Sequence, residues 1–152
     1  MIIVSSCLAG IPSRYDGRHC QDGRVAKLVK EGRAIPLCPE QLGGLPTPRA
    51  CCEITKDQDG KRMVRSKDGR EWTHHFIQGA RKTLEVAKIL EVKYLILKSK
   101  SPSCGYGRIN DGTFTGRLIE GNGITAQLLL DNGFTIYRED GLDHIPKEEI
   151  NK

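Results

Sequence analysis

Residues 2–10, IIVSSCLAG, place a short apolar run directly before a cysteine in a turn that ends in glycine. Such a run, bounded by a turn, is typical of a buried strand in a parallel sheet. The pattern returns in residues 34–37, AIPL, before a second cysteine, and in residues 94–97, YLIL, ahead of a third. The carboxyl ends of neighbouring parallel strands lie at one edge of a sheet, where open α/β folds bind their ligands. We therefore expect three cysteines to converge at that edge: Cys7, Cys38 and Cys104.

The segments between these strands predict helices, so the chain is expected to form one α/β domain with a mainly parallel sheet flanked by helices. The predicted elements are strands at 2–5, 34–38, 93–98 and 134–138 and helices at 22–31, 73–91 and 122–131. Asp22 and Thr73 are the expected N-caps of the first two helices, because their side-chain oxygens can accept hydrogen bonds from the first helical turn.

The other segments read as turns and loops. Residues 39–70 are expected to be a turn-rich loop that holds two short strand-like pieces around Asp59-Gly60, and such long loops are usually functional or mobile. A hairpin-like stretch is expected around residues 110–112. Residues 141–152 are expected to be a polar C-terminal tail, either frayed or docked loosely.

Composition limits the partners and the compartment. The formal net charge is +5, which is compatible with anionic small molecules or with weak, salt-sensitive contact to nucleic acid. The basic residues are interspersed with acids, so a solvated positive face is favoured over a nucleic-acid site. No leader peptide or membrane-spanning run is recognisable, which predicts a cytoplasmic location. In that reducing compartment the six cysteines are expected to be thiols or metal ligands.

The cysteine spacing does not decide which metal would bind. No Cys-x-x-Cys pair is present, so a metal site depends on the convergence of single cysteines, and three unrelated buried thiols are the competing interpretation. Three converging thiolates are one short of the usual four around a 4Fe-4S cluster, which would leave one iron open to a substrate atom. A zinc ion with a bound water, or copper(I), would suit the same ligands.

Five further side chains are candidates for catalysis or substrate binding. Glu40 follows Cys38 closely and could move protons, although a solvent-facing loop carboxylate is the alternative. Ser101 and Ser103 could hydrogen-bond a substrate or hold their own turn. Arg49 could clamp an oxygen of the substrate or pin its loop to backbone carbonyls. Tyr15 could face the substrate or simply pack.

Two more cysteines, Cys51 and Cys52, are adjacent in the sequence. Adjacent residues cannot easily meet the geometry of a disulfide, so these two are interpreted as small buried residues or as a secondary pair of thiols. They are the reserve candidates for metal ligands.

Short strings follow one another along nearly the whole chain. They are Cys7-Leu8-Ala9-Gly10, Arg14-Tyr15-Asp16-Gly17, Cys38-Pro39-Glu40, Gly43-Gly44-Leu45-Pro46-Thr47-Pro48-Arg49, Glu53-Ile54, Asp68-Gly69-Arg70, Lys98 with Ser101-Pro102-Ser103-Cys104-Gly105, and Asp111-Gly112-Thr113-Phe114. Together, and in this order, they resemble the thiouracil desulfurase family. The Cys-Pro-Glu and Ser-Pro-Ser-Cys-Gly strings are specific in combination.

The resemblance implies a Rossmann-like desulfurase domain over residues 1–140 that holds a 4Fe-4S cluster on three cysteines, with one open iron. Carried onto this sequence, the ligands are Cys7, Cys38 and Cys104, and the family's carboxylate and serine are Glu40 and Ser101. The implied reaction removes sulfur from a thiolated pyrimidine, either thiouracil or a thiouridine nucleotide, by hydrolysis without net redox change and with release of sulfide. A small-molecule base or nucleotide is the expected partner, ahead of tRNA, and no membrane is expected.

The chain departs from the family pattern at Ala50-Cys51-Cys52, where the family tends to carry apolar residues or proline. Either extra thiol could therefore replace one of the three ligands. The alternative function is a metal- or cluster-binding sensor without turnover.

Overall fold

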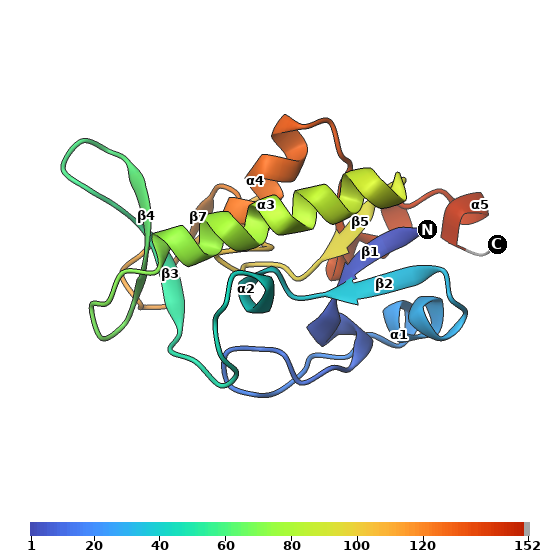
Figure 1. The fold of residues 1–152 in the computed structure, drawn as a ribbon, viewed down its shortest axis with the longest axis horizontal. Helices are drawn as coiled ribbons and strands as arrows, with labels where there is room; N and C mark the ends of the chain where they lie inside the picture. The colour runs from blue at the N-terminus through green and yellow to red at the C-terminus, as the bar shows by residue number, and fades with distance from the viewer. Residues whose placement is uncertain (151–152) are drawn as a thin grey trace.

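The computed structural model describes residues 1–150 and centres on a four-stranded parallel sheet (Figure 1). The strands run in the order β2 (Ala34–Leu37), β1 (Ile2–Ser5), β5 (Leu95–Leu97) and β8 (Ile136–Arg138). Ile3 of β1 pairs with Ile35 on one side and with Leu95 on the other, in parallel register. The strands that precede the three cysteines are therefore parallel neighbours, which confirms the predicted fold class and the predicted edge.

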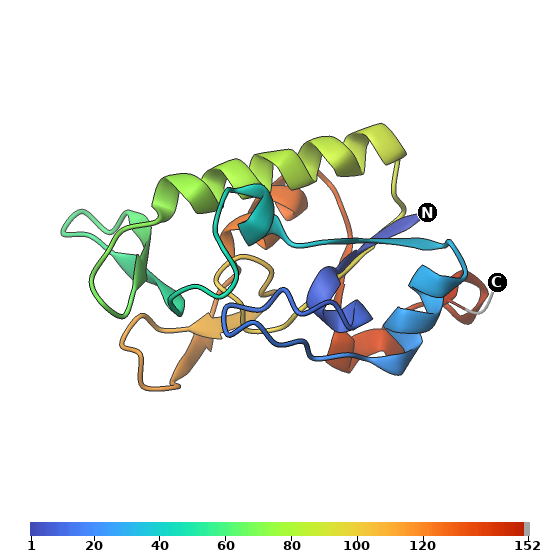
Figure 2. The same cartoon turned by 60° about the horizontal axis from the view of Figure 1, so that its bottom comes forward.

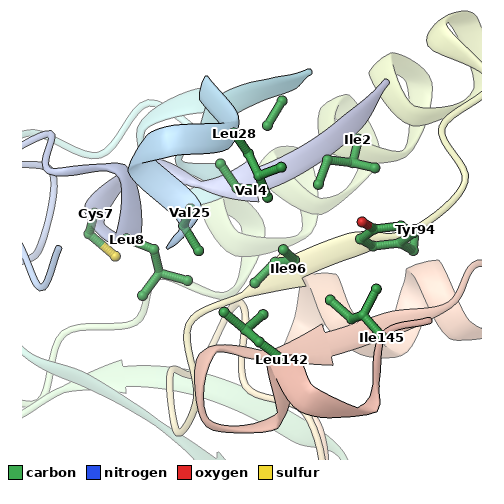
Figure 3. Packing of buried hydrophobic residues seen from close by; sticks show 11 residues of the cluster. Ile2, Val4, Cys7, Leu8, Val25, Leu28, Tyr94, Ile96, Leu142 and Ile145 are labelled. Atoms are coloured by element: carbon green, nitrogen blue, oxygen red, sulfur yellow. The ribbon is translucent and has the colours of Figure 1, made fainter. Parts of the chain in front are cut away.

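Helices cover both faces of the sheet (Figure 2). One face carries α1 (Gly23–Lys30) and the 3-10 helix η2 (Glu139–His144), and the other carries α3 (Thr73–Leu90) and α4 (Ile124–Asp131). Successive side chains of β1 alternate between the faces, so Val4 packs in the cluster of α1, and Ile3 in the cluster of α3 and α4. Figure 3 shows the first cluster, with Cys7 at its edge. The core therefore lies directly behind the predicted site.

One of the two predicted helix caps is confirmed, and the other is wrong. The carboxylate of Asp22 accepts hydrogen bonds from the backbone N–H groups of Arg24, at 2.9 Å, and Val25, at 3.4 Å, as an N-cap does. Thr73, by contrast, lies inside α3, and its hydroxyl oxygen accepts a hydrogen bond from the backbone N–H of Val64 at 3.0 Å. Thr73 fails as a cap because a tertiary contact with the neighbouring strand engages its oxygen.

The turn-rich segment 39–70 is more ordered than its sequence predicts. Its strand-like pieces are confirmed as an antiparallel hairpin, β3 (Cys52–Lys56) and β4 (Arg62–Ser66). Directly after β2, the short helix α2 (Pro39–Leu42) was not predicted. Gly43, at its end, and Gly79 of α3 allow the two helices to touch, because a Cβ at Gly79 would lie 1.9 Å from the carbonyl oxygen of Pro39. This contact positions the residues that follow β2.

The remaining elements complete the carboxyl edge and the C-terminal part. A 3-10 turn, η1 (Ser6–Ala9), follows β1, and a hairpin, β6 (Arg108–Asn110) and β7 (Leu118–Glu120), lies where a hairpin-like stretch was predicted. The last helix is α5 (Lys147–Ile150). Of the two alternatives for the C-terminal tail, frayed or docked, its first residues are docked, because Leu142 and Ile145 are buried in the cluster around α1. Among residues 1–150, no helix has the length and apolar character needed to cross a membrane.

Candidate metal centre

A cavity of about 300 Å³ opens at the carboxyl edge of the sheet, where the sequence predicts the site. Five of the six cysteines line it: Cys7, Cys38, Cys51, Cys52 and Cys104. All five are free thiols. Soft thiolate ligands favour zinc, copper(I) and iron–sulfur clusters over magnesium or calcium. The donor set of the cavity is therefore that of a soft-metal or cluster site.

The three predicted ligands come from three neighbouring strands. Cys7 lies in η1, directly after β1, and Cys38 is the N-cap residue of α2, directly after β2. Cys104 lies in the turn that follows β5, and its backbone N–H donates to the hydroxyl oxygen of Ser101 at 3.0 Å. The same turn needs Gly105, because a Cβ there would lie 2.5 Å from the carbonyl oxygen of Ser101. Strand order thus brings together three cysteines that are far apart in sequence.

Burial is the main reason why these thiols resist ionisation, and their mutual proximity adds to it. The pKa of Cys7 is raised far above its usual range by burial and then by the neighbouring thiols of Cys20, Cys104 and Cys38. Burial raises the pKa of Cys104 to about 12, and the nearby Cys38 adds to the increase. The pKa of Cys38 is also raised, first by burial. The three sulfur atoms therefore lie close enough to repel one another as thiolates, and a bound cation would relieve that repulsion.

The donors around the cavity are of the type that iron–sulfur clusters use. Within residues 1–150, no three side chains of His, Cys, Asp or Glu approach closely enough to hold one metal ion together. A 4Fe-4S cluster needs a wider spacing, because each thiolate binds a different iron. Three thiols from separate strand ends line one cavity, so the residues present fit the cluster that the family resemblance implies.

Glu40 and Arg49 form an ion pair at the wall of the cavity. Their Oε2 and Nη2 atoms are 3.0 Å apart, and the side chains are only 17% and 4% exposed. The same Nη2 donates to the carbonyl oxygen of Ser13 at 3.0 Å and contacts Cys38 Sγ at 3.8 Å. Nη1 donates to Thr47 Oγ1 at 2.9 Å and to the carbonyl oxygen of Pro46 at 3.2 Å. Arg49 thus holds Glu40 beside Cys38, with acceptors on both of its terminal nitrogens.

The two serines of the Ser-Pro-Ser-Cys-Gly turn lie in different places. Ser101 lines the cavity, and its hydroxyl oxygen accepts hydrogen bonds from the backbone N–H groups of Ser103 and Cys104, both at 3.0 Å. Its O–H remains able to donate, since accepting uses only lone pairs. Ser103 is 1% exposed, and its hydroxyl shares a hydrogen bond of 2.8 Å with that of Thr125 in α4. Of the two, Ser101 is therefore the one available to a ligand.

Tyr15 and the extra thiols complete the predicted set. Tyr15 lines the cavity and is 38% exposed, with the guanidinium of Arg14 5.6 Å from its ring centre. Burial, assisted by the charge of Glu40, raises the pKa of Cys52 to about 12. Cys51 also has a raised pKa, first because of burial. Both extra cysteines thus line the same cavity as the three predicted ligands.

Several polar residues of the cavity were not predicted. Ser6 and Ser13 share a buried hydrogen bond of 2.5 Å between their hydroxyls. Lys98 lies at the end of β5, and its Nζ is 3.2 Å from Glu139 Oε2. Lys98 was noticed only as part of a motif, and serines in a turn are too common to stand out. Ser6 and Lys98 could have been predicted as cavity residues from their positions directly after β1 and β5.

Comparisons with known proteins identify the family of this chain. A family model described as 2-thiouracil desulfurase matches residues 2–141. The uncharacterized protein YbbK of Bacillus subtilis (strain 168) is 43% identical over 150 residues, which cover 95% of this chain and 99% of that protein. A solved structure, described as the 4Fe-4S-dependent thiouracil desulfidase TudS, superposes with a TM-score of 0.85 at 39% identity, covering 95% of this chain and 93% of that one.

Proposed function

Because the chain belongs to the 2-thiouracil desulfurase family, we propose that it removes sulfur from a thiolated pyrimidine, either thiouracil or a thiouridine nucleotide, by hydrolysis. The balanced reaction exchanges the thiocarbonyl sulfur for the oxygen of water and releases hydrogen sulfide, without net oxidation or reduction. One observation carries the proposal: three free thiols from neighbouring strand ends line the same cavity as Glu40.

The proposed cofactor is a 4Fe-4S cluster held by Cys7, Cys38 and Cys104. When bound through three cysteines, such a cluster supplies one iron that can act as a Lewis acid towards the substrate. The proximity of the three cysteines supports this ligand set, because Cys104 and Cys38 add to the raised pKa of Cys7, and Cys38 adds to that of Cys104. Cys51 and Cys52 line the same cavity and are the alternatives that an experiment must exclude.

Glu40 is proposed to transfer the protons of the reaction. A carboxylate at the cavity wall can take a proton from the attacking water and return it to a ring nitrogen, which is general acid–base catalysis. Arg49 is proposed to hold that carboxylate in place, since the two side chains pair at 3.0 Å. Arg49 then affects the reaction by positioning Glu40 and does not bind the substrate directly.

Ser101 and Tyr15 are proposed to bind the pyrimidine. Both line the cavity, Ser101 with a hydroxyl proton to donate and Tyr15 with an exposed aromatic ring. Ser103, which was expected to bind substrate, is proposed instead to anchor the Cys104 turn to α4 through Thr125.

A cavity of about 300 Å³ is at the small end for ligand sites, which favours a base or nucleotide over tRNA. The free thiols suit a reducing, cytoplasmic location.

The experiment measures sulfide release and loss of thiocarbonyl absorbance after anaerobic reconstitution with iron and sulfide. Thiouracil and thiouridine monophosphate are the substrates, and the key variant is Glu40→Gln. We expect Glu40→Gln to keep its iron and to lose roughly 10²–10⁴-fold in turnover, the usual contribution of a general acid–base group. The matched control is Glu31→Gln, which removes another arginine-paired carboxylate, outside the residues that line the cavity.

The two ways in which the proposal can fail are distinct. Full turnover in Glu40→Gln would remove the proton role of Glu40. A protein that holds its iron but releases no sulfide from either substrate would instead favour the binding or sensing function.

A further inference from the structure

Cys20 is the one cysteine that is not among the described residues lining the cavity. Its backbone N–H donates to the carbonyl oxygen of Cys7 at 3.0 Å, and two residues later Asp22 donates to Leu8 at 2.8 Å. The segment that leads into α1 therefore runs alongside η1. Cys20 is half-buried and packs against the hydrophobic cluster whose edge includes Cys7 (Figure 3).

The shared backbone hydrogen bond places the two cysteines side by side. After burial, the neighbouring Cys20 contributes more to the raised pKa of Cys7 than Cys104 or Cys38 does. Residues that exchange backbone hydrogen bonds across a sheet have Cα atoms about 5.5 Å apart, within the range that a disulfide spans. Cys7 and Cys20 share one backbone hydrogen bond, at 3.0 Å, which brings them near that separation.

The other cysteines of the cavity have different nearest partners. Cys38 Sγ contacts the carbonyl oxygen of Ser13 at 3.8 Å, and Cys52 Sγ contacts that of Ala50 at 3.5 Å. Ser5 and Ser103 lower the pKa of the Cys104 thiol, against the larger effect of its burial. Cys20 is thus the cysteine placed to react with Cys7.

We propose that Cys7 and Cys20 are a reversible redox modification site, which closes into a disulfide when the site is oxidised without its cluster. Hydrogen peroxide reaches Cys20 first, because Cys20 is the more exposed thiol, and oxidises it to a sulfenic acid with release of one water. The Cys7 sulfur then attacks the Cys20 sulfur, an S–S bond forms, and a second water leaves. Two thiols and one peroxide give one disulfide and two waters.

The disulfide would block iron binding by Cys7 and would also protect Cys7 from further oxidation. The inference uses the proposed function only in taking Cys7 as a cluster ligand. While paired, Cys7 cannot bind iron, so the site stays closed until a thiol reductant opens it. Without Cys20, further peroxide would carry Cys7 to the sulfinic acid, which thiol reductants do not reverse. Cys20 therefore keeps Cys7 in a form that can bind a new cluster after reduction.

The test maps the disulfide in the full chain after iron has been removed with a chelator. Trypsin cuts after Arg14, Arg18 and Arg24, so Cys7 and Cys20 fall in separate peptides, residues 1–14 and 19–24. After treatment with hydrogen peroxide, we expect mass spectrometry without reductant to find most of these two peptides linked. Dithiothreitol should then separate them and restore iron uptake to the level of untreated protein.

Two variants make the result specific. In Cys20→Ser, peptide 1–14 should gain two oxygen atoms on Cys7, and dithiothreitol should fail to restore iron uptake. Cys51→Ser is the matched control, because it removes another half-buried cysteine and should leave the link between Cys7 and Cys20 intact. A link from Cys7 to Cys38 or Cys104, or equal Cys7 oxidation in wild type and Cys20→Ser, would overturn the proposal. The mapping needs neither iron nor turnover, so it stands even if the proposed function fails.

Discussion

The Arg49 side chain connects three parts of the site. It pairs with Glu40 of α2, donates to the backbone of Ser13 in the loop after η1, and contacts the thiol of Cys38. With 4% of its side chain exposed, it has little surface left for a substrate. These contacts favour a positioning role, and kinetics can separate that role from substrate binding.

Replacement of Arg49 by lysine keeps the charge but removes the planar fork that binds several acceptors at once. We expect Arg49→Lys to keep its iron and to lose roughly 10–100-fold in kcat with little change in KM, because a misplaced carboxylate slows the chemical step. Steady-state kinetics of the reconstituted protein measure this split. An increase in KM at constant kcat would mean that Arg49 binds the substrate directly.

A double variant tests whether Arg49 acts through Glu40. If it does, adding Arg49→Lys to Glu40→Gln should cost little beyond the single change at Glu40, since residues that work as a unit are not additive. Two independent losses of full size would contradict the positioning role.

Sequence reasoning identified these side chains but left their roles open. Glu40, Arg49 and Ser101 all line the cavity, whereas Ser103 is buried against Thr125. The roles could not be predicted, because the decisive partners are distant in the sequence. Ser13 is 36 residues from Arg49, and Thr125 is 22 residues from Ser103. Only the folded chain brings such pairs together.

The contact of α2 with α3 fixes Cys38 and Glu40 relative to the sheet. Gly43 and Gly79 make that contact possible, since a Cβ at Gly43 would lie 2.1 Å from the carbonyl oxygen of His75. The obstacle in each case is backbone, which cannot rotate away as a flexible side chain can. The spacing of the two helices therefore depends on these glycines.

We expect Gly79→Ala to push α2 away from α3, because its Cβ would lie 1.9 Å from the carbonyl oxygen of Pro39. Overpacking of this kind costs about 1–3 kcal/mol in the free energy of unfolding, or more. Denaturant unfolding measures the loss, and iron per chain should fall with it, because Cys38 precedes Pro39 directly. Gly23→Ala in α1 is the control, since a Cβ there meets no atom within 4 Å. Equal stability of the two variants would contradict this account of the helix contact.

Elements with a local sequence signal were predictable, whereas α2 was missed. Strands β1, β2 and β5 were found because each is an apolar run ended by a turn, which is a local signal. Helix α2 has only four residues, too few to show a helical period. Its one local signal was Pro39 after Cys38, since proline is favoured at the first position of a helix.

Across the whole molecule, strand order explains why the cysteines meet. Strands β2, β1 and β5 are adjacent, so their carboxyl ends deliver Cys38, Cys7 and Cys104 to one edge. This convergence was predictable from the sequence, because parallel strands of an open sheet share the direction of their ends. The burial of Leu142 and Ile145 in the cluster around α1 was not, since two apolar residues in a polar stretch are too few to show a periodic signal.

The measurement that tests this account most directly is iron and acid-labile sulfide per chain, after anaerobic reconstitution of wild type and of Cys7→Ala, Cys38→Ala and Cys104→Ala. We expect about four irons per chain in wild type, as for one 4Fe-4S cluster, and loss of the cluster in each of the three variants. Cys51→Ala and Cys52→Ala should keep it, and the unfolding temperature of every variant shows whether it has folded. A cluster that survives the loss of Cys7, Cys38 or Cys104, or that disappears only when Cys51 or Cys52 is replaced, would contradict the three-cysteine site.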